Sequence, residues 1–256
     1  MKKNGGKISG AILFLLLVSG LFYLTFFQVN KTQKGEIKMI VVTGNNLLSE
    51  SDYLSFTRLN DISKYAGIRL SVIKDRFEKH PYVENADVEL NGDRTVIVKI
   101  TEKKIAGVLL SGKEPNLITG KFQVLPLLPD TKFIDLPVIS NIRDDDKIIP
   151  MKFIKNKDII QAFRIIEAAK LTNTDILRKL SEINLRKGGD VVLTFSGIKP
   201  PVIYGRGEDA KKMVYLDIMW EQINNVTNLS TQSDYIDLRF ANEIFVGNIE
   251  NTGLSE

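Results

Sequence analysis

The sequence predicts an α+β protein in which one N-terminal membrane helix precedes two folded modules. Three observations support this prediction. An uncharged apolar run occupies Ile8–Phe27. Strand-like and helical patterns then follow one another between residues 37 and 104, and they end in a hairpin signature. From residue 105 onward, short strand-like segments are interspersed with amphipathic helices.

The composition limits the classes of function that the protein can have. The 256 residues are 43% hydrophobic and 26% charged, which is enough for one or two packed domains. The net charge is +4, but basic residues alternate with acids and no arginine-rich arm is present, which argues against nucleic-acid binding. The absence of cysteine excludes disulfides, thiol catalysis and cysteine-ligated zinc.

Residues 8–27 predict a single transmembrane helix, because about 20 apolar residues span a bilayer core. The alternative is a cleaved signal peptide, whose apolar region is about 7–15 residues long and ends at a small-residue cleavage site. We favour an uncleaved anchor, because this run is longer and bulky aromatic residues occupy its far end. The short tail 1–7 would then be cytoplasmic, and the chain from about Lys31 onward would lie outside the cytoplasm.

After a polar linker at 28–36, residues 37–104 predict a strand–helix–helix–strand–strand module. The segment EIKMIVVT predicts the first strand, and Ser49 predicts the N-cap of the first helix. The segment SVIKDRFEKHP predicts a second helix that is capped by Ser71. This helix should end at His80, because the residue before a proline avoids the α region.

The strongest local signal is the sequence VENADVELNGDRTVIVKITE. Alternating apolar residues flank Asn91-Gly92, which predicts an antiparallel hairpin closed by a type I′ turn. The order of elements, with VVTGNN at the start and HPYVENADV before the hairpin, resembles a POTRA domain. That resemblance implies a module that binds polypeptides, often by adding a strand to an exposed sheet edge. Another small α+β domain is the alternative.

Residues 105–249 continue without an obvious linker and predict a β-rich domain with interspersed helices. The segments KIAGVLL, NLITGKFQVLP, DLPVISNI and PPVIYG predict strands, and Gly188-Gly189 predicts the turn of a further hairpin. Lys157–Leu171 and Glu208–Asn225 predict two long amphipathic helices. The last strand-like segment is YIDLRFANEIFVG, and a short tail at 250–256 follows it.

This layout resembles the bacterial cell-division family FtsQ/DivIB over nearly the full length. The segment LITGKFQVLPLLP resembles the strand–Gly–strand segment of the family, DLP at 135–137 its Leu-Pro turn, YGRGEDAKKM its strand-to-helix entry, and YIDLRF its terminal signature. Two departures are Thr119, where the family often has Asp, and EKKIAG, which lacks a common Pro. The resemblance implies an FtsQ-type β domain. It also implies a non-catalytic divisome scaffold at the septum, with its N-terminus cytoplasmic and its bulk periplasmic on the inner (cytoplasmic) membrane.

The segment DYIDLRFANEIFVGN is the predicted partner-binding site. Its alternation places Ile236, Leu238 and Phe240 on one face, towards the core. The family resemblance implies that an FtsB-like protein adds a strand here, in a complex that also contains an FtsL-like protein. Other division proteins would bind the POTRA domain and the membrane helix. The predicted contact residues are Arg239, Phe240, Ala241, Glu243, Ile244, Phe245 and Val246.

Two of these residues have predicted roles. Arg239 matches the arginine of the family signature, and the resemblance implies an ion pair with a partner carboxylate. Phe240 is the predicted aromatic anchor, because aromatic side chains dominate binding hot spots.

The sequence carries little that predicts chemistry. His80 is the only histidine, so the usual nucleophile–base pairs are nearly excluded. Asp144–Asp146 is interpreted as a solvated loop rather than a metal site, and GRGEDAKK lacks the spacing of a phosphate loop. We therefore expect no enzymatic activity and no cofactor. The alternatives are an inner-membrane-anchored POTRA chaperone or translocation adaptor, and an anchored envelope enzyme whose site is not recognisable.

Overall fold

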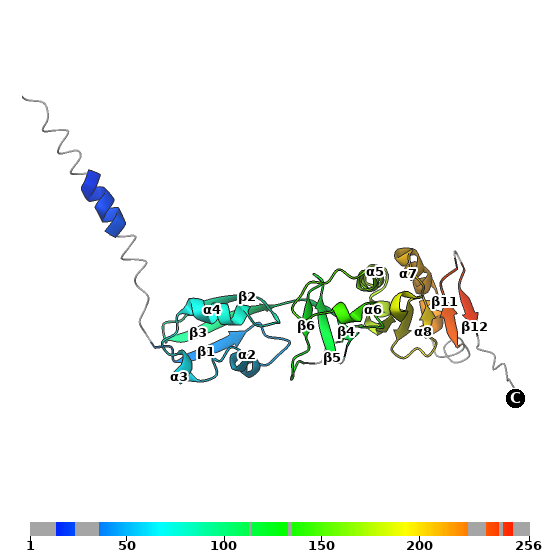
Figure 1. The fold of residues 1–256 in the computed structure, drawn as a ribbon, viewed down its shortest axis with the longest axis horizontal. Coiled ribbons are helices and arrows are strands. Elements are labelled where there is room, and N and C mark those ends of the chain that lie inside the picture. Colours follow the sequence, from blue (N-terminus) through cyan, green and yellow to red (C-terminus); the bar gives the residue numbers. More distant parts are fainter. Residues whose placement is uncertain are drawn as a thin grey trace, which may run out of the picture.

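The computed structural model describes residues 14–23, 36–112, 114–132, 135–224, 234–240 and 243–247. Two sheets, each with its helices, follow one another along the long axis of the molecule (Figure 1). The predicted cytoplasmic tail at 1–7 and the C-terminal tail at 250–256 lie outside the described residues, as does nearly all of the predicted linker.

The predicted membrane segment is described only in part. Residues 14–23 are helical and their large apolar side chains are exposed, whereas the remainder of 8–27 lies outside the described residues. In the part of the chain that the structure describes, no helix combines the length and the apolar character that a membrane crossing requires.

The first sheet contains three strands in the order β1-β3-β2, with β1 parallel and β2 antiparallel to the central strand β3. This arrangement confirms the predicted strand–helix–helix–strand–strand order and adds one short helix, α3. The elements are β1 (Met39–Thr43), α2 (Glu50–Phe56), α3 (Ile62–Tyr65), α4 (Leu70–Glu78), β2 (Val83–Leu90) and β3 (Thr95–Glu102).

Of the two predicted helix caps, one is confirmed and one is wrong. The Ser49 hydroxyl accepts from the Asp52 N–H at 3.3 Å, and the Asp52 carboxylate accepts from the Ser49 N–H at 3.0 Å, which completes a capping box. Helix α4 instead begins at Leu70, before the predicted cap Ser71, and its N-cap Arg69 makes no side-chain cap bond.

The predicted hairpin between β2 and β3 is confirmed, but its turn type is wrong. The loop holds the four residues 91–94, and the Arg94 N–H donates to the Asn91 carbonyl at 3.0 Å. The left-handed residue is Arg94, with φ 69°, whereas a type I′ turn needs positive φ at Asn91 and Gly92. The Asp93 carboxylate accepts from the Thr95 N–H at 3.0 Å, which stabilises the longer loop.

The second sheet contains nine strands in the order β12-β11-β10-β9-β8-β7-β4-β5-β6. Its pairs are antiparallel except for β4–β7, β7–β8 and β10–β11. The strands are β4 (Ile105–Ser111), β5 (Glu114–Thr119), β6 (Val124–Pro126), β7 (Val138–Ser140), β8 (Leu180–Asn184), β9 (Val192–Phe195), β10 (Val202–Ile203), β11 (Tyr235–Asp237) and β12 (Phe245–Gly247).

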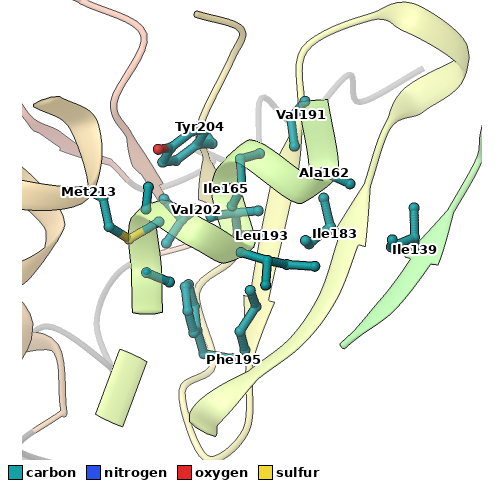
Figure 2. Close-up of a cluster of buried hydrophobic side chains, with 14 of the residues drawn as sticks. Ile139, Ala162, Ile165, Ile183, Val191, Leu193, Phe195, Val202, Tyr204 and Met213 are labelled. Carbon is teal, nitrogen blue, oxygen red and sulfur yellow. The ribbon is translucent and has the colours of Figure 1, made fainter. Parts of the chain in front are cut away.

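Helices α5 and α7 share one apolar core with this sheet. Ala162 and Ile165 of α5 lie among the side chains of the strands, and Met213 of α7 lies beside them (Figure 2). The helices are α5 (Lys157–Thr172), α6 (Thr174–Lys179), α7 (Asp209–Ile218) and α8 (Trp220–Asn224), with short 3₁₀ turns at Asp145–Lys147 and Arg186–Gly188. The predicted single helix Glu208–Asn225 is therefore wrong: it is interrupted at Met219, and Asn225 lies outside the described residues.

The two sheets meet through buried side chains. The hydroxyl of Tyr82, the residue directly before β2, accepts from the Leu128 N–H at 2.9 Å and donates to the carbonyl of Pro126, at the end of β6, at 3.1 Å. Leu117 and Leu125, from β5 and β6, belong to the core of the first sheet. The predicted domain boundary at residue 104 therefore stays a prediction, since the first core extends past it.

His80 is buried in the first core without a complete set of hydrogen bonds. Its ring is 1% exposed and lies between the rings of Tyr53 and Phe56, with centroids 4.5 and 4.4 Å away. Its Nδ1 accepts from the Tyr82 N–H at 3.1 Å, while Nε2 has no partner among the described residues. Burial, and then the charge of Lys103, lower the pKa of His80 to about 4.

The first prediction is a loss of stability on mild acidification. The pKa of His80 lies below the ordinary value of 6.5, so below that pH the unfolded chain takes up a proton that the folded chain resists. The free energy of unfolding should fall by about 1–3 kcal/mol between pH 6.5 and 4 through this residue. Urea unfolding of wild type and His80→Gln across this range measures it. Equal pH profiles would contradict the prediction, because glutamine keeps a neutral acceptor for Tyr82.

Candidate partner-binding edge

Strand β12 forms one edge of the nine-stranded sheet. It pairs antiparallel with β11 through Tyr235↔Gly247, Ile236↔Val246 and Asp237↔Phe245, and no described strand pairs with its other side. Figure 1 shows β11 and β12, in orange and red, at the end of the sheet farthest from the first module. An unpaired strand leaves backbone donors and acceptors that another chain can bind. The predicted contact residues lie on β12 and on the segment that leads to it.

Arg239 is held by two carboxylates of its own chain. Its Nε lies 3.0 Å from both oxygens of Asp237, and its Nη2 lies 2.6 Å from Oδ2. Its Nη1 donates to Asp190 at 2.8 Å. The Asp237 side chain is 4% exposed and the Asp190 side chain is 44% exposed, so the first pair is internal and the second faces solvent.

The local electrostatics keep Asp237 ionised. Burial alone would raise the pKa of Asp237, but the hydrogen bonds and charge of Arg239, with Lys212 farther off, outweigh it and hold that pKa below its usual value. The same carboxylates raise the pKa of Arg239. Both side chains are therefore charged at neutral pH, and the pair fixes the direction in which the guanidinium points.

Gly205 makes room for this pair. Its φ is +67°, and a Cβ at this position would meet the Arg239 Cγ at 2.9 Å and the Lys212 Nζ at 3.4 Å. Only glycine adopts this backbone conformation readily without pushing Arg239 away from the sheet. The turn after β10 therefore determines how closely the arginine stem packs.

Phe240 and Phe245 form an exposed aromatic pair beside Arg239. Their ring centroids lie 4.8 Å apart at 70°, and the Arg239 guanidinium lies 5.9 Å from the Phe240 ring. The prediction that Phe240 shares a core face with Ile236 and Leu238 is wrong. Those two side chains are buried, but Phe240 is 51% exposed, because β11 ends at Asp237 and the alternation does not continue.

The remaining predicted residues differ in exposure. Glu243 is exposed, and Val246 is 37% exposed on β12. Ile244 packs partly against the main core, which makes it a support for the edge. Ala241 lies outside the described residues. The structure thus brings Arg239, Phe240 and Phe245 together.

Three residues of this edge were not predicted from the sequence. Asp190 lies in the β8–β9 connection and Gly205 after β10, and neither carries a signal that links it to Arg239. Tyr235 covers Gly247, where a Cβ would lie 2.4 Å from its ring. The glycine in the strand pattern IFVG was the available signal, since a glycine within a strand often marks a close approach of another group.

Within the described residues, no three His, Cys, Asp or Glu side chains are placed to hold a metal ion. What the edge offers is backbone pairing, one oriented guanidinium and an apolar aromatic surface. These are features of protein recognition.

Comparison with known proteins agrees with the POTRA interpretation. Residues 36–103, which contain the first sheet and its helices, match the family described as POTRA domain, FtsQ-type. This part of the chain is an FtsQ-type POTRA domain. The module with the three-stranded sheet is therefore the POTRA domain that the segments VVTGNN and HPYVENADV predicted.

Two relatives extend the likeness beyond the POTRA domain. Cell division protein FtsQ of Geotalea daltonii is 24% identical over 223 residues, which are 87% of this chain and 76% of that protein. Cell division protein FtsQ of Agrobacterium fabrum is 26% identical over 102 residues, 40% of this chain and 32% of that protein. The chain is a distant homologue of FtsQ proteins over most of its length, and the resemblance stated from the sequence is confirmed.

The second prediction separates the internal ion pair from the exposed one. Asp237→Asn removes the negative charge of the buried side chain that pairs with Arg239. This change should lower the free energy of unfolding by about 1–3 kcal/mol. Asp190→Asn is the matched control: both members of that pair are partly exposed, so its loss should cost under about 1 kcal/mol. Urea unfolding at pH 7 compares them, and equal losses would show that Asp237 has no special role.

Proposed function

We propose that this protein is a non-catalytic, membrane-anchored scaffold of the bacterial divisome. It would link early and late division proteins at the septum by binding an FtsB-like protein together with an FtsL-like protein. The support is the FtsQ-type POTRA domain and the relatives that are named cell division protein FtsQ. In this proposal the segment 8–27 is the inner-membrane anchor, the N-terminus is cytoplasmic, and the two modules are periplasmic.

The single observation that carries the binding proposal is the open edge of β12 beside Arg239 and the aromatic pair. An FtsB-like strand that added to β12 would satisfy its outer backbone groups. Phe240 and Phe245 would contact the apolar side chains of that strand. Both rings are about half exposed, so their burial would supply hydrophobic free energy that the isolated chain does not have.

Arg239 would contribute orientation and selectivity. Its bond to Asp237 is internal, whereas its bond to Asp190 faces solvent and joins two partly exposed side chains. We propose that a carboxylate of the partner takes the place of Asp190 on Nη1. Exchange of one exposed ion pair for another changes little free energy by itself, but a partner that displaced Asp190 and lacked the carboxylate would leave the Arg239 Nη1 without an acceptor.

An inner-membrane-anchored POTRA chaperone or translocation adaptor is the second candidate. It shares the POTRA domain and the proposed anchor, and the capacity of such domains to bind polypeptides favours it. Localisation of a fluorescent fusion distinguishes the two functions. A ring at midcell supports the division scaffold, whereas a uniform distribution in the envelope supports the adaptor.

The third prediction tests the aromatic anchor. Phe240→Gln should weaken binding of an FtsB-like partner at least tenfold, because it removes an exposed apolar ring from the centre of the proposed contact. The fold should survive, since that ring is not part of the buried core. Titration calorimetry with the purified partner measures the affinity.

Ile218→Gln is the control for the same variant. Ile218 is 70% exposed on α7, so this variant also replaces an exposed apolar side chain with glutamine, but on a different surface. It should leave the affinity within twofold. If Phe240→Gln binds as tightly as this control, the edge is not the binding site.

A further inference from the structure

A second surface lies at the opposite end of the nine-stranded sheet. The segment Lys147–Lys157, here called the basic-apolar strip, runs along β6. The Val124 N–H donates to the Lys152 carbonyl at 2.9 Å, and the Ile154 N–H donates to the Phe122 carbonyl at 2.9 Å. The strip is therefore attached to the outermost strand at the end away from β12.

The strip presents large apolar side chains to solvent. Ile149, Met151 and Phe153 are 56%, 42% and 68% exposed. A folded domain gains no stability from three such exposed side chains within five residues, and exposed apolar clusters of this kind mark interaction sites.

The backbone of the strip is also strained. The Lys152 N–H donates to the Ile149 carbonyl at 3.2 Å, which closes a β-turn over Pro150 and Met151. Met151 has φ 66° at the third position of this turn, where a type II turn favours glycine. A methionine here costs conformational energy and exposes an apolar side chain, so neither packing nor turn geometry explains its presence.

The charge of the strip is of one sign. Lys147, Lys152, Lys155 and Lys157 fall within these residues, all four are exposed, and no acid interrupts them. Of these four lysines, only Lys147 has a carboxylate of the described residues within ion-pair distance, that of Asp144. The other three ammonium groups are available to a negatively charged ligand.

We propose that the basic-apolar strip binds an acidic, apolar polypeptide segment of a partner protein. Carboxylates of that segment would pair with the lysines, and its apolar side chains would cover Met151 and Phe153. The positive charge is confined to a narrow band, because the acids Asp144–Asp146 directly precede the strip. A flat anionic membrane would meet these acids as well, whereas a polypeptide can follow the band alone. The proposal does not depend on the division role or on the β12 edge.

The test uses the full-length chain in detergent and a labelled 12-residue peptide of alternating glutamate and leucine. Fluorescence anisotropy should show saturable binding that weakens at least tenfold when glutamine replaces every glutamate of the peptide. Equal binding of both peptides, or of neither, would overturn the proposal.

Met151→Gly makes the test independent of folding. Glycine suits the positive φ of this position, so the variant should be at least as stable as wild type in urea and yet bind the acidic peptide at least fivefold more weakly. Phe153→Ser should weaken binding to a similar degree, while Ile218→Ser, at an exposed apolar position of α7, should not. Unchanged binding of Met151→Gly and Phe153→Ser would overturn the assignment.

A membrane is the competing ligand, and the chain allows a direct comparison because it contains no cysteine. Ile149→Cys with an environment-sensitive dye is reconstituted in vesicles of phosphatidylcholine with or without phosphatidylglycerol. We expect the same emission in both, and a blue shift only when the acidic peptide is added. A blue shift caused by phosphatidylglycerol alone would overturn the proposal in favour of lipid binding.

Discussion

Backbone pairing across the nine-stranded sheet is the constraint on which the C-terminal part of the molecule depends. Each inner strand is paired on both sides, and the short strands β10, β11 and β12 have only two or three residues each. Such strands are stable only because a long sheet and a common core precede them. The pairing must nevertheless end, and it ends at β12 with one side of the strand open among the described residues. The features that we assign to partner binding all follow from this open end.

The Arg239–Asp237 pair makes the open end specific. A guanidinium at an exposed edge would ordinarily sample many rotamers, and a partner would have to restrict them on binding. Here a buried carboxylate already holds it, and Gly205 allows its stem to lie close to the sheet. Phe240 and Phe245 are likewise packed against each other before any partner arrives. Pre-organisation of this kind lowers the entropic cost of association, so a contact of a few residues can still be selective.

The sequence predicted those features that depend on neighbouring residues. The capping residue Ser49, the β2–β3 hairpin and the terminal strand follow from local pattern, and the structure contains each of them. The predicted turn type was wrong because the loop has its positive φ at Arg94 and not at Asn91 and Gly92, which the local sequence pattern does not determine. The predictions of one continuous helix through Met219 and of a buried Phe240 were wrong for a different reason. Tertiary packing decides where a helix or a strand ends, and the local sequence does not show that packing.

Contacts between residues that lie far apart in the chain could not be predicted from the sequence. Asp190 lies 49 residues from Arg239, and only the fold brings the two side chains together. The signature DLRF indicated an important arginine, but its match to a family could not show that this arginine is already paired within its own chain. The strip at Lys147–Lys157 was also missed, because its charge and its exposed apolar side chains become one surface only when the segment is attached to β6.

The most direct measurement for the central claim is amide hydrogen exchange of the full-length protein, free and bound to an FtsB-like partner. If the partner adds a strand to the open edge, exchange should slow at Phe245–Gly247 on binding, while exchange at the outer strands β1 and β2 of the POTRA sheet should stay unchanged. Protection of a POTRA edge with no change at β12 would contradict the account, because the complex would then form without use of the open end of the sheet.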